Sequence, residues 1–388
     1  MKDVRIVVAP DSFKGSISAV AVANAMEQGI LSVFPDAEII KVPIADGGEG
    51  TIEALIVATG GQLIAQEVRG PLGDSVEARW GILGDGETAV IEMAAASGLL
   101  LVPSEKRDPC ITTTYGTGQL IKAVLDRGIR KLIVGIGGSA TNDGGMGMAQ
   151  ALGVSFLDAF GSELPGGGAA LKLLSRIDIS MIDSRLLETR IVVACDVDNP
   201  LCGPRGATAV YGPQKGATIE MVAELDAALA NYAAIAKDAT GKDVAECAGA
   251  GAAGGVGAGL LFFTKAKLQI GVEIVLEAVH FSDIVKMANF VITGEGCTDF
   301  QTAYGKAPVG VARIAKNHNV PTLCLSGSLG NRYEEVLQCG ISGLMSIIPS
   351  PMNLEDCMND ASELIEKATA RLCQVVKTGI EIGIKVEK

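Results

Sequence analysis

Residues 4–42 have the sequence VRIVVAPDSFKGSISAVAVANAMEQGILSVFPDAEIIKV and carry the clearest indication of the architecture. Val4–Ala9 is apolar except for one arginine and has the length of a strand, and Glu38–Val42 is a second such run. Between them, Ser18 is a suitable N-cap for a helix that carries apolar residues at i, i+4 spacing. Two strands joined by a helix predict a βαβ unit with a parallel sheet.

The pattern changes at about Gly61 to short runs separated by turns such as Gly70–Gly73, which favours an antiparallel meander and a second domain. Further strands are predicted at Ala89–Met93, Lys131–Ile136, Ile191–Cys195, Phe290–Thr293, Thr322–Ser326 and Leu344–Ile348. Helices are predicted at Thr117–Arg127 and 219–240, from near Pro308, from near Asn331, and at Leu354–Val376.

We therefore predict an α/β protein with two α/β domains. One is a doubly wound, mostly parallel sheet domain built from both chain ends, residues 1–60 and 286–388, and the other is an inserted α/β domain, residues 61–285. Ligands of such sheets bind at the carboxyl ends of the strands. The predicted active site lies in the cleft between the two domains.

Composition excludes several classes of function. Lys plus Arg number 32 against 45 Asp plus Glu, a formal charge of −13, which argues against nucleic acid or an anionic membrane as the main partner. The nine cysteines form no C-x-x-C pair, so disulfides and a structural zinc are not expected. Because the chain starts on a strand-like run and has no long apolar segment, we expect a cytoplasmic protein without a membrane span.

Two loops near the start of the chain follow strands and carry polar groups. Residues 11–16, DSFKGS, bring Ser12, Lys14 and backbone N–H groups to the start of a helix, where an anion would bind. The alternative is an ordinary loop with a capping serine and a solvated lysine. Residues 45–51, ADGGEGT, place Asp46 and Glu49 among glycines, which suits hydroxyl recognition or Mg²⁺, although Asp-Gly is also a common turn.

A second Asp-Gly-Gly occurs in residues 135–145, GIGGSATNDGG. This loop carries more polar side chains and more glycines than a turn requires, so we predict a functional role for Ser139, Thr141, Asn142 and Asp143.

Residues 195–201, CDVDNPL, place Asp196 directly after a strand, where it is a candidate general base or metal ligand. Asp198 and Asn199 are more simply explained as a turn before proline. Downstream, residues 212–216, GPQKG, supply Lys215 as a candidate ligand of phosphoryl oxygens.

The last such loop is residues 293–302, TGEGCTDFQT, followed by 305–308, GKAP. It joins a strand to a helix that starts at a proline, and it brings Glu295, Asp299 and Lys306 toward a phosphate at that helix terminus. The alternative is helix capping with a surface lysine.

Other common signals are absent or uninformative. No segment has the P-loop pattern or the protein-kinase signatures. Gly249, Gly251 and Gly254 satisfy G-x-G-x-x-G but lie in an Ala/Gly tract without a preceding strand, so a dinucleotide site is not predicted. The two histidines, His280 and His318, lie outside the glycine-rich loops, which disfavours Ser-His-Asp catalysis and histidine-rich metal sites.

Taken together, residues 9–15, 45–51, 137–145, 211–217 and 293–296 resemble the bacterial glycerate kinase family, the type I glycerate 2-kinases. The resemblance extends from residue 3 to about residue 375. It implies transfer of the ATP γ-phosphoryl group to D-glycerate, giving 2-phosphoglycerate, with Mg²⁺ and a two-domain α/β architecture, in the catabolism of glucarate, galactarate or glyoxylate. The family commonly has a basic residue where Cys297 stands, so a phosphate contact at that position would be weakened here.

Phosphoryl transfer requires in-line positioning, a metal, cations around the phosphoryl oxygens and a carboxylate that accepts the hydroxyl proton. Asp196 or Asp143 is then the base. The expected substrate- or phosphate-binding residues are Ser12, Lys14, Asp46, Glu49, Ser139, Thr141, Asn142, Lys215, Glu295, Asp299 and Lys306, with Asp46 and Glu295 as the Mg²⁺ ligands.

The expected partners are D-glycerate and ATP, and the chain is a candidate homo-oligomer. Two alternatives stay open. One is a kinase of the same fold that gives 3-phosphoglycerate or acts on another short hydroxy acid. The other is a non-catalytic glycerate sensor, which would be expected to lack a candidate base or the phosphate lysines.

Overall fold

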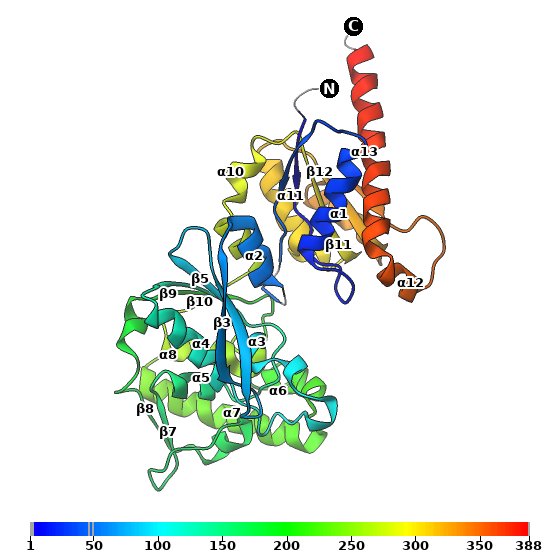
Figure 1. The fold of residues 1–388 in the computed structure, drawn as a ribbon. Helices are drawn as coiled ribbons and strands as arrows, with labels where there is room; N and C mark the ends of the chain where they lie inside the picture. The colour runs from blue at the N-terminus through cyan, green and yellow to red at the C-terminus, as the bar shows by residue number, and fades with distance from the viewer. Residues whose placement is uncertain (1–3, 46, 49, 387–388) are drawn as a thin grey trace. The chain divides into compact units, whose positions relative to one another are not determined.

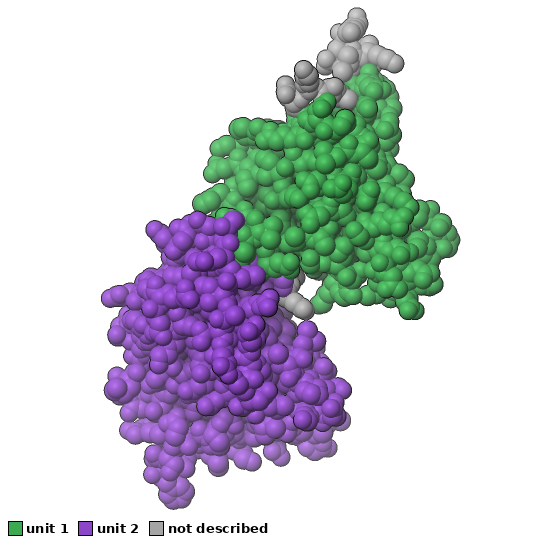
Figure 2. Space-filling view, viewed as in Figure 1, with its two compact units in different colours: residues 1–46, 53–59, 272–388 green, residues 47–52, 60–271 purple. Residues whose placement is uncertain are grey.

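The computed structural model describes residues 4–45, 47, 48 and 50–386, with the side chains described up to residue 383. The chain divides into two compact units (Figure 2). Unit 1 comprises residues 1–46, 53–59 and 272–388, and unit 2 comprises residues 47–52 and 60–271.

Unit 1 is built on a five-stranded parallel sheet with the strand order β13-β12-β11-β1-β2 (Figure 1). The strands are β1 (Arg5–Val8), β2 (Glu38–Lys41), β11 (Phe290–Thr298), β12 (Thr322–Leu329) and β13 (Ile341–Ser346). Ile6 of β1 lies opposite Ile39 of β2 on one side and Phe290 of β11 on the other. The predicted sheet from both chain ends is therefore confirmed.

Helices cover both faces of this sheet. The helices that lie wholly or mostly in unit 1 are α1 (Ala19–Leu31), α2 (Thr51–Thr59), α9 (Gly271–Ala278), α10 (Phe281–Val285), α11 (Ala307–Asn317), α12 (Leu354–Asn359) and α13 (Ala361–Val386). Leu325 of β12 packs in the core with α1 and α13, whereas its neighbour Cys324 packs with Val309 and Ala312 of α11. Successive strand residues thus face opposite layers, which confirms the doubly wound arrangement.

The first helix forms as the sequence pattern predicts. The Ser18 hydroxyl accepts a hydrogen bond from the Ala21 N–H at 3.3 Å, which satisfies one free donor of the first turn. Val22, Met26 and Ile30 follow at i, i+4 spacing and are fully buried.

Unit 2 contains a six-stranded mixed sheet with the order β10-β9-β6-β5-β4-β3. Its strands are β3 (Gln62–Arg69), β4 (Ser75–Ile82), β5 (Thr88–Glu92), β6 (Lys131–Gly135), β9 (Arg190–Ala194) and β10 (Lys267–Gln269). β3, β4 and β5 form the antiparallel meander, and β5, β6, β9 and β10 pair in parallel. β7 (Ser155–Leu157) and β8 (Arg176–Asp178) form a separate antiparallel pair.

The helices of unit 2 are α3 (Ala94–Ser97), α4 (Tyr115–Asp126), α5 (Met146–Ala151), α6 (Ala207–Tyr211), α7 (Ile219–Thr240) and α8 (Ala252–Phe263). Gly254 in α8 has φ +69°, and a Cβ at this position would lie 1.9 Å from the Thr141 carbonyl oxygen. The G-x-G-x-x-G match therefore serves close packing of α8 on the 141–145 loop.

The chain returns to unit 1 at Val272, before residue 286 where the sequence suggested the boundary. The reason is that α9 packs on α11. A Cβ on Gly310 would lie 2.9 Å from the Val272 side chain, and Glu273 pairs with Arg313 at 2.6 Å. This contact is between side chains far apart in sequence, so no local pattern marks it.

Two predicted helices differ in the structure. The helix expected from Asn331 is the 3₁₀ helix η7 (Tyr333–Cys339), enclosed by left-handed Arg332 (φ 57°) and Gly340 (φ 112°). The last helix is divided at Asp360 into α12 and α13, and α13 continues beyond residue 376 to Val386.

The nine cysteines are free thiols. Among the residues that the structure describes, the helices include none with the length and apolar character needed to cross a bilayer.

Candidate active site

In unit 1, the loop after β1 lies against the end of β11. The Asp11 N–H donates to the Gly294 carbonyl at 2.8 Å, and a Cβ on Gly296 would lie 3.5 Å from the Lys14 backbone nitrogen. Ser12 in this loop is half-buried and Lys14 is exposed. The structure therefore brings the loop of Ser12 and Lys14 next to the loop that carries Glu295.

Glu295 is a buried carboxylate with 6% exposure. Its Oε1 accepts hydrogen bonds from the Thr298 hydroxyl at 2.9 Å and the Thr302 hydroxyl at 2.7 Å. Burial raises the pKa of Glu295, while these two hydroxyls and the charge of Lys306 oppose the rise. Among the described residues Oε2 has no hydrogen-bond partner, so one oxygen is available to a cation or a hydroxyl donor.

Asp299 and Lys306 belong to the same loop. Asp299 Oδ1 accepts the Gln301 N–H at 2.8 Å, which forms a turn, and Lys306 is the N-cap of α11 with Pro308 in its first turn. Lys306 therefore lies at a helix N-terminus that is suited to an anion, as predicted.

In unit 2, Lys215 is almost completely enclosed, with 1% exposure. Its Nζ donates to the Ser139 hydroxyl at 2.8 Å and to the Thr141 carbonyl at 2.6 Å. Burial lowers the pKa of Lys215 to about 7, and the charge of Asp143 opposes this. The lysine thus ties the predicted 139–142 loop to the turn at 213–216, and Asn142 Nδ2 donates to Thr208 Oγ1 at 2.8 Å.

Asp143 is fully buried and its carboxylate is occupied. It accepts hydrogen bonds from the Thr114 N–H (2.9 Å) and hydroxyl (2.8 Å), and from the N–H groups of Gly145 (3.1 Å) and Gly147 (3.2 Å). Burial raises the pKa of Asp143, and the Thr114 and glycine donors oppose the rise. A substrate hydroxyl does not reach a carboxylate enclosed in this way, so the geometry favours a positioning role for Asp143.

Asp196 has the opposite environment. It is exposed at the carboxyl end of β9, and its Oδ1 accepts the Gly271 N–H at 2.8 Å. Asp198, two residues further, pairs with Arg205 at 2.9 Å in solvent. Of the two predicted bases, Asp196 is the one whose carboxylate lies at the surface.

Asp46 and Glu49, the remaining predicted residues, lie outside the described residues. Between them, Gly47 (φ +90°) contacts the ends of β6 and β9, because a Cβ at Gly47 would lie 2.3 Å from Ala194 and one at Gly135 would lie 2.6 Å from the Gly47 oxygen. In the part of the chain that is described, no three His, Cys, Asp or Glu side chains gather as a metal site.

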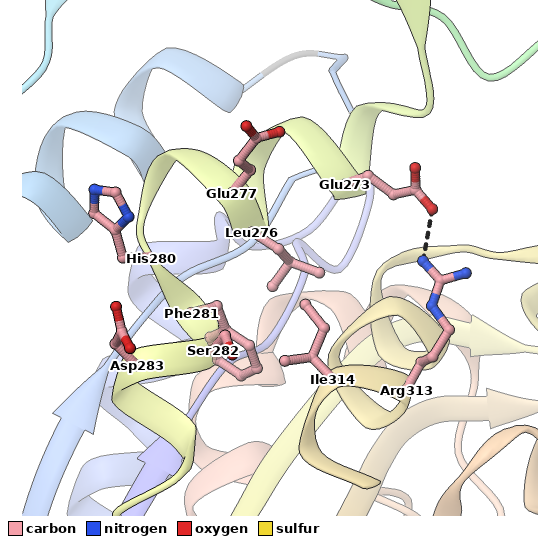
Figure 3. Close-up of a pocket in the computed structure, with 9 residues that line it drawn as sticks. All are labelled: Glu273, Leu276, Glu277, His280, Phe281, Ser282, Asp283, Arg313 and Ile314. Carbon is pink, nitrogen blue, oxygen red and sulfur yellow. Dashed lines mark hydrogen bonds and ion pairs between the residues drawn. The ribbon is translucent and has the colours of Figure 1, made fainter. Parts of the chain in front are cut away.

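Unit 1 also has a surface pocket of about 370 Å³ between α9, α10 and α11 (Figure 3). Leu276, Phe281 and Ile314 provide its apolar lining, and the Glu273–Arg313 ion pair lies at its edge. None of the described residues that we predicted for the site lines this pocket.

Sequence reasoning missed the hydroxyl partners of the two buried carboxylates. Thr298 and Thr302 stand within the quoted 293–302 loop, and Thr114 ends a run of three threonines before α4. A run of threonines before a helix is a signal for capping and hydroxyl hydrogen bonds, so the run before α4 could have pointed to Thr114 as a hydroxyl donor.

The comparisons with known proteins agree with one another. The model of the glycerate kinase family matches residues 6–377. A glycerate kinase of Bacillus subtilis (strain 168) is 54% identical over 373 residues, 96% of this chain and 98% of that protein. A glycerate 2-kinase of Escherichia coli (strain K12) is 50% identical over 376 residues, 97% and 99% of the two chains. A crystal structure from Salmonella typhimurium LT2, assigned to glycerate kinase 2, has a TM-score of 0.89 and 49% identity, and covers 98% of this chain and 100% of that chain.

The α/β fold and the family match together identify an α/β phosphotransferase. The chain belongs to the glycerate kinase family.

Proposed function

We propose that the protein transfers the γ-phosphoryl group of ATP to D-glycerate and forms 2-phosphoglycerate. The observation that carries this proposal is the family match over residues 6–377, together with relatives at 50–54% identity named glycerate kinase and glycerate 2-kinase. The loops described above supply the parts that this reaction needs.

Asp196 is the proposed general base. As the glycerate oxygen forms its bond to the γ-phosphorus and the bond to ADP breaks, the hydroxyl proton passes to the Asp196 carboxylate. Its exposure at the end of β9 supports this role, and the enclosed Asp143 instead holds Thr114 and the start of α5 in place.

Lys14 and Lys306 are the proposed ligands of phosphoryl oxygens in unit 1. Lys14 is exposed in the loop beside β11, and Lys306 caps α11, where the helix dipole also favours negative charge. Ser12 and Asp299 lie in the same two loops. In unit 2, Lys215, Ser139, Thr141 and Asn142 are the proposed ligands of the substrate or of a phosphate. The predicted position of the site, in the cleft between the domains, stays a prediction.

Mg²⁺ is the proposed metal, with Glu295 as its ligand from the described residues. The Glu295 carboxylate fits this role because Oε1 is fixed by two hydroxyls while Oε2 has no partner in the described part of the chain. Magnesium commonly takes one or two protein carboxylates and completes its shell with phosphate oxygens and water. When bound, the ion offsets negative charge on the transferring phosphoryl group. Asp46 is the second proposed ligand.

We further propose a cytoplasmic location, where ATP is available, while the homo-oligomer stays a prediction. The function is tested by measuring ADP release from ATP and Mg²⁺ with D-glycerate, L-glycerate, hydroxypyruvate and lactate in turn. We expect the highest kcat/KM with D-glycerate. Faster turnover of another hydroxy acid would identify that acid, and not D-glycerate, as the substrate. Binding of D-glycerate without ADP release would support the non-catalytic sensor.

A further inference from the structure

The two carboxylate oxygens of Glu295 have different surroundings. Oε1 accepts hydrogen bonds from the hydroxyls of Thr298 at 2.9 Å and Thr302 at 2.7 Å, and both threonines are fully buried. A carboxylate oxygen has two lone-pair positions, so these two donors occupy both positions on Oε1. Glu295 therefore has only Oε2 left for a ligand.

Oε2 is open to solvent. It accepts no hydrogen bond from the described residues, and it is not one of the enclosed side-chain atoms that lack a partner there. Those enclosed atoms are Trp80 Nε1, Arg107 Nε, Thr141 Oγ1, Asn142 Oδ1, Tyr232 Oη and Thr322 Oγ1. An unpartnered oxygen that is not enclosed is in contact with solvent, so a ligand can reach Oε2, in contrast to the carboxylate of Asp143.

Other groups of the fold fix the direction of both hydroxyls. Thr302 Oγ1 accepts the Asp299 N–H at 3.2 Å, which leaves its own proton for Glu295. Ser326 is the register partner of Glu295 on β12, and its hydroxyl lies 2.6 Å from Thr298 Oγ1. Because Thr298 has one hydroxyl proton and donates it to the carboxylate, Ser326 is the donor to Thr298. Both threonine hydroxyls are thus held toward Oε1.

We propose that Thr298 and Thr302 determine the choice of divalent cation, because they restrict Glu295 to coordination through one oxygen and thereby favour Mg²⁺ over Ca²⁺. This inference rests on the proposed function, in which Glu295 is a metal ligand. Mg²⁺ requires near-octahedral geometry, and the two oxygens of one carboxylate lie too close together for neighbouring octahedral positions. Ca²⁺ accepts more oxygens in a flexible shell and takes carboxylates through one or both oxygens.

The test compares Thr302→Val and Thr298→Val with Thr322→Val. Valine resembles threonine in shape and removes the hydroxyl, so each of the first two variants opens one position on Oε1. Thr322 is the matched control, since it is fully buried at the start of β12 and its hydroxyl has no partner. Calorimetry measures the Kd of a non-hydrolysable ATP analogue in excess Mg²⁺ and, separately, in excess Ca²⁺.

We expect wild type and T322V to bind the Mg²⁺ complex more tightly than the Ca²⁺ complex. T302V and T298V should each reduce this preference on the order of 10-fold. The ratio of the two Kd values is the decisive readout, because loss of structure or of the Glu295 charge would weaken both complexes alike. Thr302→Ser keeps the hydroxyl and should retain the wild-type ratio.

A wild-type ratio in folded T302V and T298V would overturn the proposal. If one of them does not fold, the other decides. If neither folds, wild type and T302S decide: a preference for Mg²⁺ in both supports the proposal, and equal affinity of wild type for the two complexes overturns it. The proposed function is tested separately by ADP release with D-glycerate. A wild-type protein that transfers no phosphoryl group would refute that function, while the nucleotide titrations still test the two threonines.

Discussion

Asp143 and Asp196 are the same residue type in two different surroundings, and we propose a different role for each. Asp143 is fully buried and holds backbone N–H groups of Gly145 and Gly147 as well as both donors of Thr114. Asp196 stands exposed at a strand end. Since a general base must reach the hydroxyl proton, exposure separates the two carboxylates where the sequence left them equivalent.

Asp196→Asn is expected to lower kcat by about 10²- to 10⁴-fold, because the amide cannot accept the hydroxyl proton. The asparagine oxygen still accepts the Gly271 N–H, so the free energy of unfolding should change little. Asp198→Asn is the matched control, since Asp198 lies in the same loop and forms an exposed ion pair. Steady-state kinetics of both variants check this. Near wild-type turnover in D196N would remove Asp196 from the chemistry.

Lys215 makes stability depend on pH in a defined direction. Burial lowers the pKa of Lys215 to about 7, against an ordinary value of 10.5 in the unfolded chain. Between these values the unfolded state binds more protons, so the contribution of Lys215 to stability rises with pH from about 7 to 10.5, and it is constant below pH 7.

The test is urea unfolding of wild type, Lys215→Met and the exposed control Lys106→Met at several pH values from 6 to 10. Above pH 7, the free energy of unfolding of wild type should increase relative to that of K215M, by at most about 1.4 kcal/mol per pH unit. K106M should follow wild type throughout. Parallel curves for wild type and K215M would show that this lysine titrates normally.

Residue types could be predicted from the sequence, but their surroundings could not. Glycine-rich clusters that carry Asp or Lys pointed to Asp143 and Lys215, because those patterns are local. Their burial depends on segments distant in sequence, such as Thr114 against Asp143, which no local pattern encodes.

At the scale of elements, α1 and α13 lie side by side on one face of the unit 1 sheet (Figure 1). The contact is close at Gly29, where a Cβ would lie 2.4 Å from the Glu366 carbonyl oxygen and 2.7 Å from the Thr369 Cβ. The N-terminal and C-terminal segments of the chain are therefore held together through a glycine.

Gly29→Ala is expected to destabilise the protein by about 1–3 kcal/mol, because the added methyl forces the helices apart. Gly379 is the matched control, since it lies in α13 with open space around its Cβ position. Gly379→Ala should instead stabilise by up to about 1 kcal/mol through helix propensity. Denaturant unfolding measures both variants, and equal effects of the two would contradict the close contact at Gly29.

The strands and the first helix could be predicted because their apolar spacing is local. The course of η7 and the placement of α9 could not be predicted. η7 depends on left-handed backbone at Arg332 and Gly340, and α9 belongs to unit 1 through its packing on α11.

For the whole molecule, the residues proposed for phosphoryl transfer come from both units. Lys14, Glu295 and Lys306 belong to unit 1, and Asp196 and Lys215 belong to unit 2. The proposed reaction draws on both sets, on the nucleotide and on a metal.

Removal of metal should therefore stop catalysis without unfolding the protein. With excess EDTA we expect phosphoryl transfer to fall to background and to return on addition of Mg²⁺, while the Tm of the ligand-free protein stays constant. The reason is that magnesium is expected to arrive with the nucleotide, since the described residues form no metal cluster of their own. A Tm that falls on chelation would indicate a structural metal, and unchanged turnover would exclude a metal requirement.

The proposed reaction is tested most directly by ³¹P NMR of the purified protein with ATP, Mg²⁺ and D-glycerate, because one spectrum reports both transfer and the position of the new phosphate. We expect the resonances of ADP and 2-phosphoglycerate to grow in equal amounts. A 3-phosphoglycerate resonance would contradict the assigned product, and an unchanged ATP spectrum would contradict the kinase.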